Sequence, residues 1–534
     1  MPVAATHPHT LQELIAQLAA QNPDDVVVTI DGEPETAEGL RRRVVSAANQ
    51  LGALGMRAGD RLALYGVNSL EWLVVWLACA ALGIRAIPIN VAFRGEFLVH
   101  QLRQSDVKLV FVDGNLAGAI AEVAGALPSL KVALVHGAGP AAALPSAVRV
   151  LDSGYLAEGD CTEIADAPPS NGGEPFCVFY TSGTTGPSKG AVVSQQYLLS
   201  GAATIAHAFE FGPDDCIYGA LPLFHFGGSV GLLLSGLLSG AKVALDSSFS
   251  VSGFWARVRE ERATVFVGVG PMVNMVFGSG GLLPEPAEMP IRLVLAAPVA
   301  PDVRALIERE YDCVVRGVYG MTEIFPLCLH PLAGPAPTGS AGYLNPDFEL
   351  KIVGEDGKEV PQGAAGEITA KPRRDHVMFA GYEPVPDGAA PPPLEWFATG
   401  DLGRLDETGS LYFVDRKKDA IRRRGENISS FEVERAYLGH PAVAECAAHA
   451  VPSDVGEDDV KLCVVLASGV AVPTAHELFV HGEDTLPGYA VPRYLEFLDV
   501  LPKTVTGRVR KYELRERAST GQVWDRTVLD GTKR

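Results

Sequence analysis

The chain has little of what a disulfide framework, a zinc site or a nucleic-acid surface requires. Its eight cysteines are scattered and form no Cys-x-x-Cys pair, so we interpret them as small core residues in a reducing compartment. Basic residues are in the minority, because 44 Lys and Arg stand against 64 Asp and Glu, a formal net charge of −20. Nucleic-acid backbones demand a basic surface, so this balance argues against a nucleic-acid partner.

Long hydrophobic runs are missing as well. The longest apolar run, Trp72 to Leu82, is about half the length that a membrane span needs, and it predicts a buried helix. Residues 1–8 lack the basic and apolar regions of a signal peptide. We therefore expect a protein without a membrane span, located in the cytoplasm.

The length and patterning of the chain predict an α/β protein of more than one domain. At 534 residues it is too long for one core. Strand-like and helical stretches alternate, which is typical of parallel-rich sheets with helices on their faces. From about 339 to 414 the expected elements are short strands, which indicate a β-rich subdomain, and the end of the chain has an α+β pattern. The predicted strands of the alternating part are residues 61–65, 84–89, 107–112, 242–245, 264–269 and 292–295.

The stretch Tyr-Thr-Ser-Gly-Thr-Thr-Gly-Pro-Ser-Lys-Gly at residues 180–190 carries the strongest chemical signal. Glycines allow backbone N–H groups to converge on one point, and such groups bind anions. Four hydroxyls add donors, Lys189 adds a positive charge, and the apolar segment 176–180 predicts a strand just before the loop. A flexible surface loop is the alternative. The spacing differs from that of a Walker loop, and the pattern favours a phosphate-binding loop.

Further segments follow this loop in a fixed order. They are Leu-Pro-Leu-Phe-His at 221–225, Tyr-Gly-Met-Thr-Glu at 319–323, Thr-Gly-Asp at 399–401, Asp-Arg-Lys-Lys-Asp at 415–419 with Gly-Glu-Asn-Ile-Ser at 425–429, and Leu-Pro-Lys-Thr-Val-Thr-Gly-Arg at 501–508. Together they resemble the adenylate-forming superfamily, which contains acyl- and aryl-CoA synthetases, luciferases and peptide-synthetase adenylation domains. The resemblance covers nearly the whole chain.

The resemblance implies a nucleotide site for ATP, Mg²⁺ and an acyl-adenylate (AMP ester). Glu323 would be the Mg²⁺ ligand, since hard cations favour carboxylate and phosphate oxygens, and Thr322 would bond the α-phosphate. Alternatively, Thr322 and Glu323 are a helix N-terminal pair, itself a phosphate site. Asp401 would accept the ribose hydroxyls. The full set implied for the nucleotide is Thr181, Ser182, Gly183, Thr184, Thr185, Lys189, Ala297, Pro298, Tyr319, Gly320, Thr322, Asp401 and Arg416.

The resemblance also implies an acyl pocket, a CoA site and two domains. The mobile C-terminal domain would comprise residues 417–534, rotating about Lys418 after an N-terminal domain of residues 1–416. Gly425 would leave room for the pantetheine arm of CoA, and Arg422, Arg423 or Arg493 would meet its phosphates. The mostly apolar pocket favours a bulky hydrophobic acid; its predicted residues are Phe224, His225, Phe226, Gly227, Val269, Gly270, Met272, Ala297 and Met321. For His225, packing in the core is the alternative.

The chain departs from the superfamily pattern at three places. The adenine segment is shortened to Ala296-Ala297-Pro298-Val299, and Gln195 stands where a histidine is usual. The third departure is Gly507-Arg508 in place of Gly-Lys, whose lysine bridges the carboxylate and the α-phosphate during adenylation only. Arginine is longer, planar and forked, so it is not an equivalent donor.

The exchange at Arg508 leaves two hypotheses open. In the first, adenylation is slow or absent, and a separate adenylating enzyme supplies the acyl-adenylate that this chain converts to the CoA thioester. In the second, Arg508, Lys503 or Lys511 substitutes, and the chain is an ordinary two-step acyl-CoA synthetase. Rival functions are an adenylation domain loading a carrier protein, a luciferase-type oxygenase and a nucleotide-binding regulator. Many superfamily members dimerise, so a homodimer is also considered.

Overall fold

The computed structural model divides the chain into two compact units, Met1–Glu349 with Lys371–Glu395, and Leu350–Ala370 with Trp396–Arg534. The predicted division at residues 416 and 417 stays a prediction. The structure describes residues 8–139, 144–165, 167–181, 188–278, 283, 285, 290–297, 299–334, 336–384, 395–417, 419, 421–423, 426–428, 430–453, 458–486, 488, 490–503, 509–516, 519 and 522–529.

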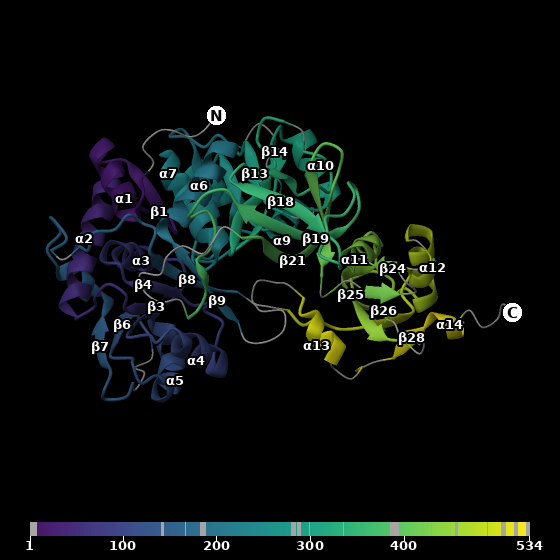
Figure 1. Cartoon of the computed structure of the whole chain (residues 1–534), viewed down its shortest axis with the longest axis horizontal. Helices are drawn as coiled ribbons and strands as arrows, with labels where there is room; N and C mark the ends of the chain where they lie inside the picture. The colour runs from purple at the N-terminus through teal and green to yellow at the C-terminus, as the bar shows by residue number, and fades with distance from the viewer. Residues whose placement is uncertain are drawn as a thin grey trace. The chain divides into compact units, whose positions relative to one another are not determined.

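An eight-stranded sheet forms one half of the first unit (Figure 1). Its strands run parallel from β8 to β7, whereas β9 and β20 pair antiparallel at the other edge. The strand predicted at residues 61–65 is confirmed as β3. In sheet order the strands are β20 (Gly381–Tyr382), β9 (Lys189–Ser194), β8 (Pro175–Thr181), β4 (Arg85–Pro88), β3 (Arg61–Tyr65), β5 (Leu109–Asp113), β6 (Val132–His136) and β7 (Arg149–Asp152).

The long apolar run of the sequence is the helix α3 (Leu70–Leu82), and every residue from Trp72 to Leu82 is buried. The Ser69 hydroxyl caps its first turn, and Gly83 ends it in a left-handed conformation. The predicted buried helix is therefore confirmed. The other helices of this half are α1 (Leu11–Gln21), α2 (Ala37–Ala53), α4 (Gly95–Gln104) and α5 (Ala117–Val123).

A seven-stranded sheet forms the other half of this unit, and it is parallel except for the edge hairpin β1–β2. A core cluster containing Phe254, Phe266 and Phe277 packs among the strands and the helices α8 to α10. In order the strands are β14 (Val314–Arg316), β13 (Leu293–Leu295), β12 (Val265–Val267), β10 (Cys216–Gly219), β11 (Lys242–Leu245), β1 (Val26–Ile30) and β2 (Glu33–Thr36). The helices are α6 (Gln195–Ala208), the π-helix η4 (Gly227–Leu234), α7 (Ser235–Ser239), α8 (Phe254–Glu261), α9 (Gly270–Gly278) and α10 (Pro301–Glu310).

Three antiparallel strands complete the first unit. They are β15 (Val318–Met321), β16 (Ile324–Leu329) and β17 (Gly342–Leu344). The first two are joined by a turn of two residues, because Met321 pairs with Ile324. This hairpin carries the predicted Thr-Glu pair.

The second unit contains two sheets and a short hairpin. β18 (Phe348–Val353), β19 (Gly366–Pro372), β21 (Phe397–Leu405) and β22 (Ser410–Arg416) bear out the strands expected between 339 and 414. A four-stranded sheet follows with β25 (Val443–Pro452), β26 (Asp458–Leu466), β27 (Tyr494–Phe497) and β28 (Val523–Asp525), and the hairpin is β23 (Ile421–Arg423) with β24 (Glu426–Ile428). Its helices are α11 (Ser430–Leu438), α12 (Ala475–Thr485), α13 (Lys511–Glu516) and α14 (Arg526–Leu529).

Two expectations drawn from absences can be compared with this fold. All eight cysteines are free thiols, and all except Cys161 are buried, as expected of core residues. Among the described residues, no helix combines the length and the apolar character that crossing a membrane requires. Mixed α/β architecture, with a large N-terminal part and a smaller C-terminal α+β part, is confirmed.

Candidate functional site

The predicted acyl and nucleotide segments of the first unit gather at one edge of the seven-stranded sheet. The segment 221–227 follows β10, residues 269–272 follow β12, Ala296 and Ala297 follow β13, and residues 317–322 follow β14. These four strands are consecutive parallel neighbours, so their carboxyl ends share an edge. Ligands of open α/β sheets bind at such edges.

The loops after β13 and β14 approach each other closely. A Cβ built on Gly317 would lie 3.1 Å from the Cβ of Ala297, and the Ala296 N–H donates to the Arg316 carbonyl at 3.0 Å. The sequence thus places a residue without a side chain where two predicted nucleotide segments meet. Ala297 itself is exposed, whereas Pro298 lies outside the described residues.

Thr322 and Glu323 form the turn between β15 and β16, so their alternative interpretation as a helix N-terminal pair is wrong. The flanking residues explain the difference, because valine, tyrosine, isoleucine and phenylalanine favour strands. A phosphate bound at this turn would therefore contact groups of Thr322 and Glu323, and this turn would not offer it a helix N-terminus. The Thr322 carbonyl accepts a hydrogen bond of 3.1 Å from the buried Tyr197 hydroxyl, which anchors the turn to α6.

Glu323 is 6% exposed and is held by hydroxyl donors from two distant strands. The Tyr382 hydroxyl on β20 donates to Glu323 Oε1 at 2.7 Å, and Thr181 Oγ1 at the end of β8 lies 3.5 Å from the same oxygen. Burial, together with the negative Glu323, raises the pKa of the Tyr382 phenol. Lys189 Nζ lies 5.1 Å from the Tyr382 ring centre. The fold therefore brings Thr181, Lys189 and Glu323 together, as predicted, around a tyrosine that sequence reasoning missed.

The chemistry of this donor set fits a hard divalent cation. Glu323 supplies a carboxylate and Thr181 a hydroxyl, and oxygen donors of this kind are what Mg²⁺ takes. No group of three or more His, Cys, Asp or Glu side chains suited to a metal occurs within the described residues. A Mg²⁺ ion here would accordingly depend on one carboxylate and on substrate phosphate oxygens.

The second end of the glycine-rich loop is held by α4. Thr181 and Lys189 are partners in the β8–β9 pairing. His100 Nε2 lies 2.9 Å from the Ser188 carbonyl, which accepts the hydrogen bond, and Gln101 Nε2 donates to Ser188 Oγ at 3.1 Å. No local sequence signal links α4 to this loop. The predicted loop residues Ser182, Gly183, Thr184 and Thr185 lie outside the described residues.

The predicted acyl-pocket residues occupy two environments. Phe226 is 6% exposed and packs against Phe179, Tyr197 and Phe325 at ring-centre distances of 5.3–5.4 Å, which makes it part of an aromatic core cluster. The Phe224 and His225 rings, 4.7 Å apart, lie on the preceding turn. The others are at the sheet edge: Gly227 begins η4, Val269 is exposed, Gly270 begins α9, and Met272 and Met321 are half-buried.

Tyr319 and Gly320 lie in β15, where the pairing with β16 is irregular. A Cβ on Gly320 would lie 2.8 Å from the Ile324 carbonyl oxygen and 3.0 Å from the Phe325 ring. A side chain at this position would force the hairpin apart. Gly320 thus permits the tight packing beside the Thr322–Glu323 turn.

Asp401 and Arg416 form an ion pair within the second unit. They are cross-strand partners on β21 and β22, with Arg416 Nε 3.0 Å from Asp401 Oδ1. The aspartate is 2% exposed, and its N–H donates to Thr399 Oγ1 at 3.1 Å. The predicted ribose-binding aspartate is therefore held in place by the predicted Arg416.

Two of the three basic residues predicted for CoA, Arg423 and Arg493, form ion pairs with carboxylates in the second unit. Arg423 Nε lies 2.8 Å from Asp459 Oδ1, and the Arg493 guanidinium lies 2.7 Å from Asp459 Oδ2 and 3.3 Å from Asp525. Arg423 is only 6% exposed. Arg422 lies on β23, and its side chain is outside the described set, as are Lys418, Gly425 and Arg508. The CoA assignments stay predictions.

Two lysines considered as substitutes for the adenylation lysine are also paired. Lys511 Nζ lies 2.8 Å from Glu434 Oε1 and contacts Ser430 Oγ, which in turn donates to Asp415 Oδ2 at 2.7 Å. Lys503 Nζ lies 2.5 Å from Glu445 Oε2. Each lysine thus has a partner within its own unit.

Gln195, one of the departures from the superfamily pattern, is a buried tie between helices. Its Oε1 accepts the Leu11 N–H at 2.8 Å, and its Nε2 donates to the Ala80 carbonyl at 3.1 Å. The side chain therefore joins α1 to α3 at the start of α6. An amide suits this position because it donates and accepts simultaneously.

The fold and these residues define an α/β protein with its candidate site on loops at strand ends. A sequence profile of the AMP-binding enzyme family matches residues 15–382, and the profile of the AMP-binding enzyme C-terminal domain matches residues 432–508. The chain belongs to the AMP-binding enzyme family.

Three similar proteins cover almost the whole chain. An oxalate–CoA ligase of Arabidopsis thaliana is 29% identical over 94% of this chain and 97% of its own length. An indoleacetate–CoA ligase of Aromatoleum aromaticum is 30% identical over 95% and 98%. The structure of o-succinylbenzoate CoA synthetase (MenE) from Bacillus subtilis with its acyl-adenylate intermediate superposes with a TM-score of 0.81, 25% identity, and coverage of 95% and 99%. The relatives named as CoA ligases belong to the acid–thiol ligases.

Proposed function

We propose that this chain is an acyl-CoA ligase that forms the CoA thioester of a bulky hydrophobic carboxylic acid through an acyl-adenylate. The names of the relatives support the reaction class, although their acids range from oxalate to indoleacetate. The choice of a bulky acid depends on the apolar residues after β10 and β12. The observation that carries the proposal is the assembly of Thr181, Lys189 and Glu323 beside the loops that follow β13 and β14.

In the proposed reaction, the substrate carboxylate attacks the α-phosphorus of ATP and pyrophosphate leaves. The CoA thiol then attacks the acyl carbonyl carbon, and AMP leaves. Negative charge builds on phosphate oxygens in the first step, so positioning and electrostatics supply the catalysis. A Mg²⁺ ion bound at Glu323 would supply charge neutralisation.

The residues of this chain divide the work of orienting the nucleotide. Lys189 and the N–H groups of the glycine-rich loop would hold the β- and γ-phosphates, and Thr322 would bond the α-phosphate. Asp401, oriented by Arg416, would accept the ribose hydroxyls, and Tyr319 would stack on adenine. We further propose that residues 417–534 rotate about Lys418 between the two steps and bring Arg422 and Gly425 to the CoA arm.

We also propose that Arg508 restricts the first step more than the second. The pairing of Lys511 with Glu434 and of Lys503 with Glu445 supports this, because neither lysine is a ready substitute. An acid held by the longer, forked guanidinium would lie off the line of attack, and a displacement of about 1 Å can cost on the order of 100-fold in rate. A separate adenylating enzyme would then supply the acyl-adenylate.

Two assays on the full chain test this function. The first follows pyrophosphate release from ATP with a panel of carboxylic acids, and the second follows thioester formation from synthetic acyl-adenylates and CoA. We expect thioester formation to be brisk and pyrophosphate release to be slow. Brisk release would favour an ordinary two-step synthetase, and the absence of both pyrophosphate release and thioester formation would overturn the ligase proposal.

A further inference from the structure

Asn68 is a buried amide whose three hydrogen bonds all go to backbone groups of distant segments. It is 4% exposed and lies shortly after β3. Its Nδ2 donates to the Leu221 carbonyl at 3.1 Å and to the Asp246 carbonyl at 3.0 Å, and its Oδ1 accepts the Leu223 N–H at 2.8 Å. An amide suits this position because its Nδ2 donates to two carbonyls while its Oδ1 accepts an N–H.

These bonds join the carboxyl ends of the two sheets of the first unit. β3 belongs to the eight-stranded sheet, whereas Leu221 and Asp246 follow β10 and β11 of the seven-stranded sheet. Asn68 therefore crosses from one sheet to the other at the edge where the predicted site loops gather. Sequence reasoning missed it, because its partners are 153 and 178 residues away.

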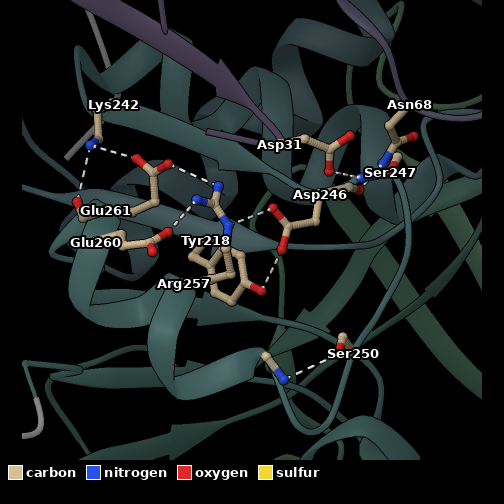
Figure 2. A network of polar contacts seen from close by, with 11 residues as sticks. Asp31, Asn68, Tyr218, Lys242, Asp246, Ser247, Ser250, Arg257, Glu260 and Glu261 are labelled. Atoms are coloured by element: carbon tan, nitrogen blue, oxygen red, sulfur yellow. Dashed lines mark hydrogen bonds and ion pairs between the residues drawn. The ribbon is translucent and has the colours of Figure 1, made fainter. Parts of the chain in front are cut away.

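The Asp246 end of this bridge is itself held by a polar network (Figure 2). The Tyr218 hydroxyl donates to Asp246 Oδ2 at 2.8 Å, and Arg257 Nε donates to Asp246 Oδ1 at 3.1 Å. Arg257 also bonds Glu260 at 2.8 Å and Glu261 at 2.9 Å. Asn68 thus bonds the backbone of Asp246, whose side chain is held by this network, and it also bonds the segment after β10.

The segment after β10 is the part whose conformation Asn68 sets. The Leu223 N–H that it accepts is adjacent to Phe224, whose ring lies 4.7 Å from that of His225. The His225 N–H donates to the Pro222 carbonyl at 3.0 Å, and the π-helix η4 begins at Gly227. π-helical turns are rare in proteins, and those that occur are often found at functional sites. The side chains of Phe224 and His225 therefore project from a turn that the Asn68 amide fastens at both Leu221 and Leu223.

We propose that Asn68 is a positioning residue that selects the acid by fixing the 221–225 turn. The proposal rests on the proposed acyl-CoA ligase function. Without the amide, the turn loses the bonds at Leu221 and Leu223, and Phe224 and His225 lose their fixed place. In the proposed function the acid would contact this turn, whereas ATP and CoA would contact other segments, so we expect the effect to fall on the acid.

The test compares Asn68→Ala and Asn68→Asp with a matched control in the full-length protein. Asn49 makes the same set of bonds elsewhere: its Nδ2 donates to the carbonyls of Asp160 and Glu163, both at 2.8 Å, and its Oδ1 accepts the Ala165 N–H at 3.0 Å. Asn49→Ala therefore removes an amide that makes the same number of bonds at a more exposed position, with its partners in the segment 160–165. Acetate, oxalate, ferulate, indole-3-acetate and octanoate serve as acid probes, with their synthetic adenylates where adenylation is slow.

We expect Asn68→Ala to change the ratio of kcat/KM between the two best acids by about tenfold, the scale on which a pocket discriminates between similar groups. The KM values for ATP and CoA should stay within about twofold. This ratio does not depend on the fraction of folded enzyme, so partial unfolding leaves the test valid. Asn68→Asp, which retains only acceptors, should behave like Asn68→Ala, whereas Asn49→Ala should lower Tm and leave the ratio unchanged.

An unchanged ratio in both Asn68 variants, or an equal change in Asn49→Ala, would overturn the positioning role. If both Asn68 variants fail to fold, Asn68→Gln and Asn68→Ser are measured in the same way, and an unchanged ratio in them has the same meaning. Wild-type protein that forms no thioester from any probe would instead refute the ligase function, and the acid-selecting role with it. The two failures are therefore distinguishable.

Discussion

The hydroxyl of Tyr382 donates a hydrogen bond of 2.7 Å to Oε1 of Glu323, across 59 residues of sequence. This bond fixes the carboxylate beside Thr181 at the end of β8. It also connects the strand β20 to the turn between β15 and β16, two pieces of chain that share no strand pairing with each other. A carboxylate held in this way is oriented before any substrate arrives, which lowers the cost of assembling the site.

Removing the Tyr382 hydroxyl should raise the Mg²⁺ concentration that the enzyme requires. We expect Tyr382→Phe to lower kcat/KM for ATP by about tenfold, since one hydrogen bond to a charged group is worth roughly 1.5–3 kcal/mol. The Mg²⁺ concentration that gives half-maximal pyrophosphate exchange should rise. Tyr218→Phe is the control, because it breaks a similar bond of 2.8 Å to Asp246; it should lower Tm without changing the Mg²⁺ requirement. An unchanged requirement in Tyr382→Phe would contradict the role of this bond.

Replacing Arg508 by lysine should restore the first half-reaction. We expect Arg508→Lys to raise the rate of pyrophosphate exchange by about tenfold or more, because a compact ammonium suits a point-charge position that a forked guanidinium does not. Thioester formation from a synthetic acyl-adenylate should stay within about twofold. Arg510→Lys, at a residue paired with Glu513 at 2.5 Å, should give no gain. Absence of a gain in Arg508→Lys would direct attention to the shortened segment from Ala296 to Pro298.

The ion pairs of Lys511 and Lys503 should contribute unequally to stability. Lys511→Met should lower Tm more than Lys503→Met does, because Lys511 is 12% exposed and its partner Glu434 is largely enclosed, whereas Lys503 and Glu445 are 34% and 41% exposed. Burial raises the pKa of Glu434, and Lys511 opposes this. Neither variant should change pyrophosphate exchange by more than about twofold. A selective loss of exchange in either variant would identify that lysine as the substitute for the missing one.

His330 should make stability depend on pH. Burial, helped by Arg304 and Arg316, lowers the pKa of His330 to about 4. Between about pH 6.5 and pH 4 the unfolded chain binds a proton here that the folded chain does not, so stability falls as the pH falls through this range. His330→Gln should flatten the decline of Tm over the range.

His449 allows the same measurement at a second buried histidine. Burial lowers its pKa to about 4 as well, so His449→Gln should flatten the curve by a similar amount and the double variant by roughly the sum. A slope that remains that of the wild type in His330→Gln would show that this residue does not carry the effect.

Local patterns predicted much of the fold. Strands such as Arg61–Tyr65 and Lys242–Leu245 have the expected bounds, because apolar β-formers between turn residues leave few alternatives. The Thr322–Glu323 turn was open to a second interpretation as a helix start, since threonine and glutamate favour both settings. Pairing between β15 and β16 decides the matter, and pairing is a property of two segments.

The candidate site divides in the same way. Thr181, Lys189 and Glu323 could be predicted from motifs, because their chemistry is visible in the residue types. Tyr382 and Asn68 could not, because each acts on a partner far along the chain and neither stands in a recognisable motif. Arg423 and Arg493 show the converse difficulty, because their positive charge predicts phosphate binding from the sequence. In the fold, both form ion pairs with Asp459.

The loops at the carboxyl edge of the seven-stranded sheet have an evolutionary consequence. The loops after β10 and β12 would contact the acid, whereas those after β13 and β14 would contact the nucleotide, and each loop is a separate stretch of chain on a shared frame. Mutations that change which acid is bound can therefore accumulate in the loops after β10 and β12 while the loops after β13 and β14 stay unchanged. Proteins with this fold can therefore change their acid substrate in the course of evolution while they retain the nucleotide site.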